Sequence, residues 1–248
     1  MNRIAMHVVT GFAEKMGYSI IPKWRLENRE LAQHLGRIFE RYSVSTVFDV
    51  GANAGQYHDF LRQQVGFTGR VYSFEPQPHL VNALQQRQIS DPAWEILNFA
   101  LGSHNSELAL NVMARDTFSS FRQPLVGASE GFAASNTVVG TVTVPVRRLD
   151  DLFANHVMAD QSCYLKVDTQ GFDLEVLRGA PELLKTIKAL QFELPIQQLY
   201  AEVPPYREIL ETVEAMGFRI SGFFPISMDE DMKAVEFDCV MVRAGDSH

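Results

Sequence analysis

The stretch "VFDVGANAGQY", residues 47–57, decides how the rest of the chain is interpreted. An apolar run typical of a buried strand carries a carboxylate near its end, Asp49, and a glycine-rich turn follows from Gly51 to Gly55. An amphipathic segment comes next, so the expected order is strand, turn and helix. A unit of this kind commonly holds a nucleotide-like cofactor beyond the carboxyl end of its strand.

Two cofactors commonly occupy such a turn, and the residues distinguish them. A dinucleotide site needs G-x-G-x-x-G, but Asn53 and Gln56 stand at the second and third glycine positions. S-adenosylmethionine carries a sulfonium and an ammonium in place of a pyrophosphate, and the Asp49 carboxylate would attract these cations. Gly51 and Gly55 would let the backbone approach the methionine part. The pattern favours S-adenosylmethionine, with a nicotinamide-dependent oxidoreductase as the alternative.

Outward from this turn, short apolar runs alternate with amphipathic helical stretches. The runs are "TVFDVG", "RVYSFEP", "WEILNFALG", "CYLKVDTQG" and "ALQFELP", and the helical stretches cover residues 57–66, 79–88, 172–187 and 206–217. This alternation predicts a Rossmann-like α/β fold, with a parallel sheet between two layers of helices. The runs "FRISGFFPI" and "AVEFDCVMVR" predict a C-terminal hairpin that places one antiparallel strand in the sheet.

Two segments depart from the alternation. Residues 1–42 have apolar residues at helical spacing and predict an N-terminal helical extension to a domain of residues 43–248. This extension would pack on the main domain, or form a lid or a dimer contact. Residues 103–147 contain two alternating runs around a loop rich in Ser, Gly and Ala, which predicts an inserted β-ribbon. We expect its loop, within residues 113–140, to act as a flap over the substrate.

Composition narrows the class of protein. The 248 residues carry a net charge of −8, which disfavours a nucleic-acid substrate, because duplex binding needs a concentrated positive surface. The two cysteines, Cys163 and Cys239, lie in predicted strands and are expected to be buried free thiols. No segment approaches the ~20 apolar residues of a membrane span, and the N-terminus lacks a clean signal core. We expect a soluble, cytoplasmic protein without a stable membrane anchor. The composition is compatible with a monomer or a homo-oligomer.

Eight motifs occur in an order that resembles one family. They are "VFDVGANAGQY", "GRVYSFEPQP", "DPAWEILNFALGS", "TFSSF", "VPVRRLDDL", "YLKVDTQGFDLEVLRGA", "LQFELPIQQLY" and "EFDCVMVR". This ordered set, over residues 44–243, resembles the FkbM-type S-adenosylmethionine-dependent methyltransferases. The resemblance implies a class I methyltransferase sheet of seven strands, and an O-methyltransferase acting on a hydroxyl of a sugar, glycan or secondary metabolite. Where the family usually has an acidic residue before glycine, this chain has Gln170-Gly171.

The expected cofactor site follows from the ends of the predicted strands, because ligands of open α/β sheets lie beyond the carboxyl ends of the strands. Glu75 would accept hydrogen bonds from both ribose hydroxyls, Asn98 and Ala100 would face the adenine, and the paired serines would bond to cofactor or substrate. The residues predicted to contact the cofactor are Asp49, Gly51, Asn53, Gly55, Tyr57, Glu75, Pro76, Asn98, Ala100, Ser119, Ser120 and Asp168.

The catalytic group is expected at the ends of two neighbouring strands. Methyl transfer to a hydroxyl requires alignment and removal of a proton, and either Asp168 or Glu193 can act as the base. Lys166 lies two residues before Asp168, so it faces the same side and would pair with a carboxylate. With no third carboxylate evident nearby, a divalent metal is not favoured, and no metal ligands are assigned. His156 is the next candidate base, and a non-catalytic cofactor-binding module is the second alternative.

Overall fold

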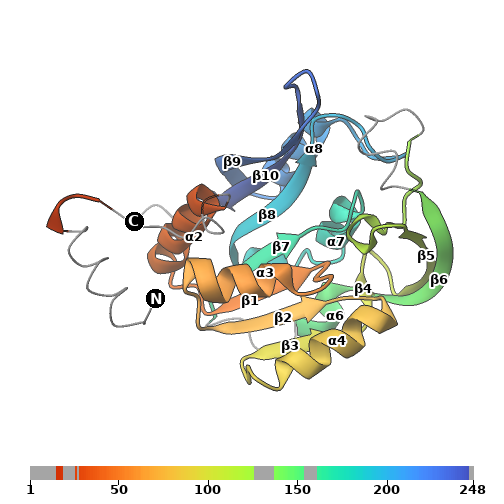
Figure 1. The fold of residues 1–248 in the computed structure, drawn as a ribbon, viewed down its shortest axis with the longest axis horizontal. Helices are drawn as coiled ribbons and strands as arrows, with labels where there is room; N and C mark the ends of the chain where they lie inside the picture. The colour runs from red at the N-terminus through yellow and green to blue at the C-terminus, as the bar shows by residue number, and fades with distance from the viewer. Residues whose placement is uncertain (1–14, 19–25, 27, 126–136, 154–160, 246–248) are drawn as a thin grey trace.

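The computed structural model describes residues 15–18, 26, 28–125, 137–153 and 161–245. In this part of the chain, one seven-stranded sheet forms the centre, in the order β3-β2-β1-β7-β8-β10-β9 (Figure 1). Its strands are β1 (Thr46–Val50), β2 (Arg70–Phe74), β3 (Trp94–Leu97), β7 (Cys163–Val167), β8 (Ile187–Pro195), β9 (Phe218–Met228) and β10 (Ala234–Arg243).

The strand directions confirm the predicted C-terminal hairpin. β10 pairs antiparallel with both β8 and β9, whereas β3, β2, β1, β7 and β8 pair parallel to one another. From β1 the chain builds the sheet outward through β2 and β3, and from β7 it builds in the opposite direction. The carboxyl ends of β1 and β7 therefore form the topological switch point, where ligands of open α/β sheets bind.

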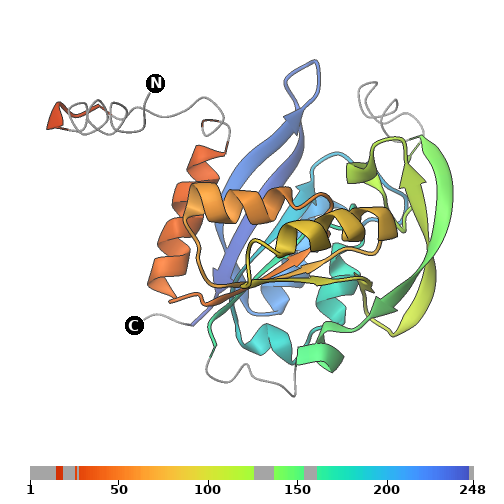
Figure 2. The same ribbon diagram turned by 60° about the horizontal axis from the view of Figure 1, so that its bottom comes forward.

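Helices cover both faces of the sheet (Figure 2). One face carries α2 (Arg29–Arg41), α3 (Gln56–Phe60), which continues into a π-helical turn, and α4 (Pro78–Gln88). The other face carries α6 (Leu149–Phe153), α7 (Asp173–Arg178) and α8 (Tyr206–Ala215). Successive residues of β1 serve the two cores, since Val47 packs on the first face and Phe48 on the second.

Two predicted elements are divided in the structure. The run at residues 94–102 forms β3 and then β4 (Ala100–Leu101), because a turn at Phe99, whose N–H donates to the Leu97 carbonyl at 3.1 Å, redirects the chain. The predicted helix at residues 172–187 ends at Arg178 and resumes as a 3₁₀ turn, Leu183–Lys185. Pro181 lies between the two pieces, and proline cannot continue a helical hydrogen-bond ladder.

The predicted β-ribbon is present as a second sheet. β5 (Ser106–Met113) and β6 (Val138–Arg147) pair antiparallel, and β4 joins β6 in the order β4-β6-β5. Residues 126–136, in the middle of the loop proposed as a flap, lie outside the described residues.

Of the predicted N-terminal extension, the structure describes one complete helix. α2 packs against the sheet through Leu35 and Ile38, and His34 Nε2 lies 2.9 Å from Ser221 Oγ of β9. The remaining predicted helix lies mostly in residues 1–14 and 19–25, which are outside the described set. Cys163 and Cys239 are buried free thiols, as predicted. Among the described helices, none is long and apolar enough to cross a membrane.

Candidate functional site

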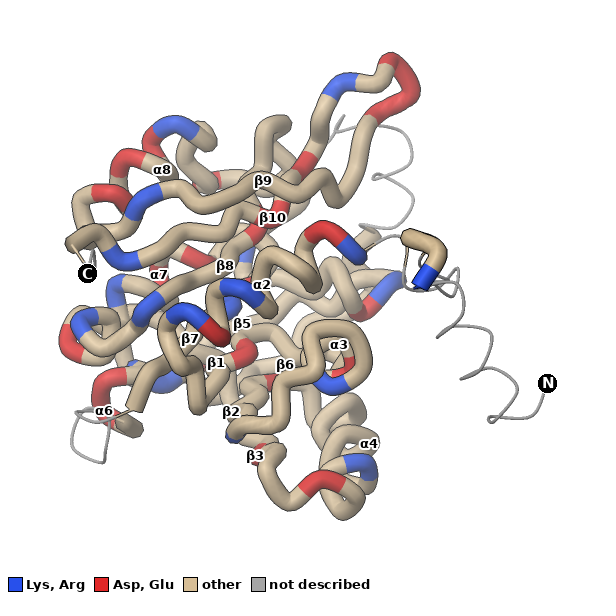
Figure 3. Tube along the Cα trace, turned by 90° about the vertical axis from the view of Figure 1, so that its left-hand side faces the viewer, with Lys and Arg blue, Asp and Glu red and all other residues tan. Residues whose placement is uncertain are grey.

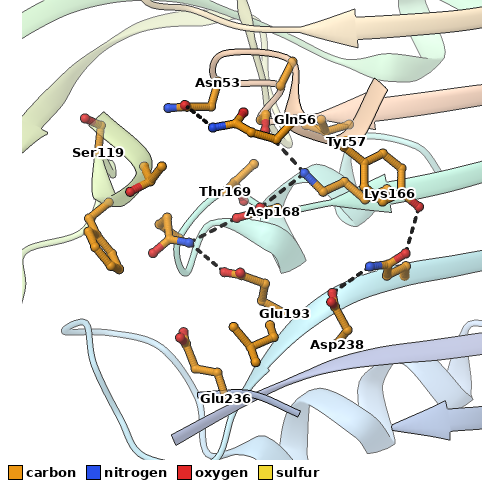
Figure 4. Close-up of a pocket in the computed structure, with 18 of the residues that line it drawn as sticks. Asn53, Gln56, Tyr57, Ser119, Lys166, Asp168, Thr169, Glu193, Glu236 and Asp238 are labelled. Atoms are coloured by element: carbon orange, nitrogen blue, oxygen red, sulfur yellow. Dashed lines mark hydrogen bonds and ion pairs between the residues drawn. The ribbon is translucent and has the colours of Figure 1, made fainter. Parts of the chain in front are cut away.

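A cavity of about 1020 Å³ opens at the switch point (Figure 4). Its walls come from the turn after β1, the end of β2, the β7–α7 loop, the ribbon segment 115–119 and the facing strands β8, β9 and β10. This volume is at the upper end of the ~300–1,000 Å³ typical of ligand pockets. The cavity is therefore large enough for a nucleoside-sized cofactor and an acceptor side by side.

The turn after β1 depends on glycine. Gly51 has φ +80°, and a Cβ there would overlap the backbone carbonyl oxygen of Asp168, at the end of the neighbouring strand. Asn53 also has a positive φ, and its side-chain oxygen accepts hydrogen bonds from the Ala54 N–H at 2.8 Å and Gln56 Nε2 at 3.1 Å. Gly51 and Asn53 line the cavity, whereas Gly55 lies against Arg87, Leu84 and Trp94 behind the turn.

Glu75 presents a carboxylate to the cavity from the end of β2. It is only 3% exposed, and its two oxygens accept the N–H groups of Asn53 at 2.8 Å and Gln77 at 2.9 Å. Burial raises the pKa of Glu75, and these two N–H groups oppose the shift. A carboxylate has about four acceptor positions, so two remain for a vicinal diol such as that of a ribose.

Lys166 forms ion pairs with carboxylates from two neighbouring strands. Its ammonium lies 3.3 Å from Asp49 Oδ1 and 3.2 Å from Asp168 Oδ2, and donates to the Gly51 carbonyl at 3.3 Å. Burial lowers the pKa of Lys166, but Asp168, Asp49 and Glu193 outweigh it, so the pKa lies above its ordinary value. Lys166 is therefore a buried cation that holds the ends of β1 and β7 together.

Asp49 lies differently from the sequence expectation. It is fully buried, accepts a hydrogen bond from Ser73 Oγ at 2.9 Å and pairs with Lys166. It is behind Lys166 and does not line the cavity. Its negative charge is thus compensated within the protein, and the carboxylates that face the cavity come from other strands.

The two carboxylates predicted as general bases, Asp168 and Glu193, are joined by one amide. Asp168 follows β7, Glu193 belongs to β8, and Gln170 Nε2 donates to Asp168 Oδ1 at 3.1 Å and to Glu193 Oε2 at 2.6 Å. The pKa of Glu193 lies well above its ordinary value, mainly because the side chain is buried and secondly because Asp168 repels its charged form. Asp168 remains 30% exposed at its side chain, and both residues line the cavity.

β10 adds two carboxylates that the sequence analysis missed. Asp238 lies directly opposite Glu193 in the antiparallel ladder, and its Oδ1 accepts a hydrogen bond from Gln191 Nε2 at 2.6 Å. Burial raises the pKa of Asp238 to about 6 and that of Glu236 to about 7. Both line the cavity, so the expectation of no further carboxylate near Asp168 and Glu193 was wrong. Among the described residues, no group of three or more His, Cys, Asp or Glu side chains has a geometry that could hold a metal ion.

The remaining predicted residues divide into two groups. Those that line the cavity are Tyr57, Pro76, Ala100 and Ser119. Asn98 is exposed in a turn, and Ser120 is buried, with its hydroxyl donating to the Gln170 carbonyl at 2.6 Å; neither is on the cavity wall. His156 lies outside the described residues. Cavity residues that the sequence analysis did not select include Gln77, Phe118, Gln170, Gln191, Glu236 and Asp238.

A mostly parallel seven-stranded sheet with one antiparallel strand and a cavity at its switch point is the architecture of the Rossmann-like methyltransferases. Residues 49–220 match the methyltransferase FkbM domain. The chain therefore belongs to the FkbM methyltransferase family, as its motifs predicted.

Two relatives and one solved structure illustrate this similarity. The 2-O-methyltransferase NoeI of Sinorhizobium fredii is 25% identical over 194 residues, which are 75% of this chain and 77% of that protein. The hexuronic acid methyltransferase AglP of Haloferax volcanii is 23% identical over 201 residues, 79% and 74% of the two chains. The structure of methyltransferase FkbM from Methylobacillus flagellatus aligns with a TM-score of 0.48 and 15% identity, over 80% of this chain and 43% of that one.

Proposed function

We propose that this methyltransferase transfers a methyl group from S-adenosylmethionine to a hydroxyl oxygen of a saccharide or glycan. The observation that carries the proposal is that one cavity is lined both by Glu75, from the end of β2, and by Asp168 and Glu193, from the ends of β7 and β8. The relatives support the acceptor class, since one is named for O-methylation and the other for hexuronic acid.

The cofactor end of the cavity fits S-adenosylmethionine. Glu75 has two acceptor positions left for the ribose hydroxyls, and the turn of Gly51 and Asn53 brings backbone to the cavity wall. Glu193, Glu236 and Asp238 make the wall formed by β8 and β10 acidic. Negative charge there suits a cationic methyl donor and disfavours the pyrophosphate of a nicotinamide dinucleotide. When bound, S-adenosylmethionine supplies an electrophilic methyl group on a sulfonium.

The acceptor end would orient a hydroxyl and remove its proton. Asp168 follows β7, Glu193 belongs to the adjacent β8, and both line the cavity, so either carboxylate could face a hydroxyl bound there. As the acceptor oxygen forms its bond to the methyl carbon and the sulfur–carbon bond breaks, one of these carboxylates would take the hydroxyl proton. Lys166 would hold Asp168 in place for this step, through the ion pair at 3.2 Å. We propose this step as one without a bound metal, the version that the sequence favoured.

The ribbon would provide the acceptor wall. Arg115, Phe118 and Phe121 line the cavity from the segment that follows β5, within the insertion at residues 103–147. An aromatic surface beside a group of carboxylates suits a sugar ring, which has apolar faces and polar edges. We propose that this insertion closes over the acceptor as a flap, while residues 43–248 form the catalytic domain.

Calorimetry with two ligands tests the cofactor assignment. We expect S-adenosylhomocysteine, the product of methyl transfer, to bind the cavity and NAD or NADP to bind at least tenfold more weakly. The opposite order of affinities would support the oxidoreductase alternative and overturn the proposal.

A further inference from the structure

The side-chain amide of Gln170 lies between the carboxylates of Asp168 and Glu193, the two proposed general bases, and donates to both. Its Nε2 is 3.1 Å from Asp168 Oδ1 and 2.6 Å from Glu193 Oε2, so both amide hydrogens are directed at carboxylates. Its Oε1 accepts a hydrogen bond from the buried Tyr200 hydroxyl at 2.8 Å. These contacts define the orientation of the amide, because the reverse orientation would direct its oxygen at two carboxylates.

The backbone of Gln170 is held as firmly as its side chain. The residue has φ +53°, in the left-handed region that non-glycine residues rarely occupy. The buried Ser120 hydroxyl donates to its carbonyl oxygen at 2.6 Å, from the ribbon side of the cavity. Gly171 follows with φ +90°, and a Cβ there would meet Val203. A strained conformation that is fixed by several neighbours is typical of a functional position.

The charges around Gln170 show what its amide does. Asp168 and Glu193 accept its hydrogen bonds, and Glu193 is in turn repelled by Asp173 on α7 and by Glu236 and Asp238 on β10. Lys166 contacts Asp168 through the other oxygen, Oδ2. Between Asp168 and Glu193, the N–H groups of the Gln170 amide donate hydrogen bonds to Asp168 Oδ1 and Glu193 Oε2.

We propose that Gln170 is a positioning residue, whose amide bridges Asp168 and Glu193 in the place that a divalent cation would otherwise take. Oxygen ligands such as these two carboxylates are those that Mg²⁺, Ca²⁺ and Mn²⁺ select, and the amide satisfies them with hydrogen bonds instead. This inference rests on the proposed role of the two carboxylates at the acceptor end. It assigns to this chain a site that works without a metal.

Binding of Mn²⁺ alone, followed by electron paramagnetic resonance, tests the bridging role. In Gln170→Glu, three carboxylates would converge where an amide now separates two, and we expect Mn²⁺ to bind at least tenfold more tightly than to the natural protein. The control is Gln197→Met, which removes an amide that also bonds a carboxylate, Asp229, at 2.9 Å, outside the cavity. It should bind Mn²⁺ like the natural protein. Equal Mn²⁺ affinity in the natural protein and Gln170→Glu would overturn the inference.

Titration of Glu193 gives a second readout, independent of any acceptor. Carboxyl carbons labelled with ¹³C can be followed by NMR, and the Glu193 signal is assigned by its loss in Glu193→Gln. Without the Nε2 donor the charged form loses a hydrogen bond, so Gln170→Met should raise the titration midpoint of Glu193 by about one pH unit or more. Gln170→Glu should raise it too, through repulsion, and is isosteric, so it serves if the Met variant fails to fold. An unchanged midpoint in the folded variants would contradict the bridge.

The two proposals can fail separately. If S-adenosylhomocysteine does not bind, the cofactor assignment fails, whereas the Glu193 titration still reports on the Gln170 bridge. If S-adenosylhomocysteine binds and the titration does not move, the proposed function stands and the bridge is refuted.

Discussion

At the scale of single residues, the site depends on how each buried charge is compensated. Asp49 is fully buried and has Lys166 as its cation at 3.3 Å, while Glu75 relies on two backbone N–H groups. A buried charge that loses its partner is costly, whereas a carboxylate held by backbone donors stays available to a ligand. We therefore expect the Asp49–Lys166 pair to contribute mainly to stability and Glu75 to contribute mainly to cofactor binding.

Removing the Lys166 charge should expose this difference. Lys166→Met keeps most of the side-chain volume but leaves Asp49 without a cation, which should cost about 3–5 kcal/mol in the free energy of unfolding. Denaturant unfolding measures the loss. Asp49→Asn in the same chain should recover much of it, because the unpaired charge is then gone. If the two changes add without coupling, the ion pair is not what stabilises this position.

Removing the Glu75 carboxylate should act on the cofactor instead. Glu75→Ala loses charge-assisted hydrogen bonds worth on the order of 1.5–3 kcal/mol, so affinity for S-adenosylhomocysteine should fall roughly tenfold or more. Isothermal calorimetry provides the measurement, and Glu230→Ala, an exposed residue at the tip of the β9–β10 hairpin, is the control. An affinity that is the same in both variants would remove Glu75 from the cofactor site.

At the scale of elements, the order of strands and helices could be predicted, but the long-range pairing could not. Runs such as Thr46–Val50 and Cys163–Val167 are short, apolar and flanked by turns, so their type follows from local pattern. The position of Asp238 opposite Glu193 depends on β10 inserting between β8 and β9, which no local pattern states. Its alternation with Glu236 in "VEFDCV" was a usable signal, because two carboxylates on one face of a buried strand need a reason to be there.

The turn after β1 can be tested by one added methyl group. Gly51→Ala would force a residue with a side chain into φ +80° and place its Cβ against the Asp168 carbonyl oxygen, so we expect a loss of roughly 2–4 kcal/mol in unfolding free energy. Gly36→Ala is the matched control. Gly36 lies in α2 with no atom within 4 Å of an added Cβ, and this change should stabilise the protein by up to about 1 kcal/mol. Equal effects at both sites would contradict the close contact of β1 and β7.

At the scale of the whole molecule, acidic residues are gathered on the wall of the cavity. Figure 3 shows acidic positions along β10 and at the tip of its hairpin, in a chain whose net charge is −8. On this wall, burial raises the pKa of Asp238 to about 6 and that of Glu236 to about 7. The folded protein thus holds protons on this wall that the unfolded chain would release, and its stability depends on pH.

The sign of this dependence can be checked at Glu236. Its pKa rises from an ordinary 4.5 to about 7 on folding, so between these values the folded state binds more protons, and stability falls as pH rises. Glu236→Gln cannot ionise, so relative to the natural protein it should gain on the order of 2 kcal/mol more at pH 8 than at pH 4.5. Urea unfolding at both pH values measures it, with Glu230→Gln as an exposed control. A difference between variant and natural protein that does not change with pH would show that Glu236 ionises normally.

Methyl transfer itself provides the most direct test of the central claim. The protein would be incubated with S-adenosylmethionine labelled in its methyl group and a panel of neutral and acidic saccharides, and the products would be analysed by mass spectrometry. We predict a saccharide that gains the labelled methyl group on a hydroxyl oxygen, and a rate reduced roughly 10²-fold or more in Asp168→Asn, the usual scale for loss of a general base. Tight cofactor binding with no labelled saccharide in the panel would contradict the account and identify a cofactor-binding module instead.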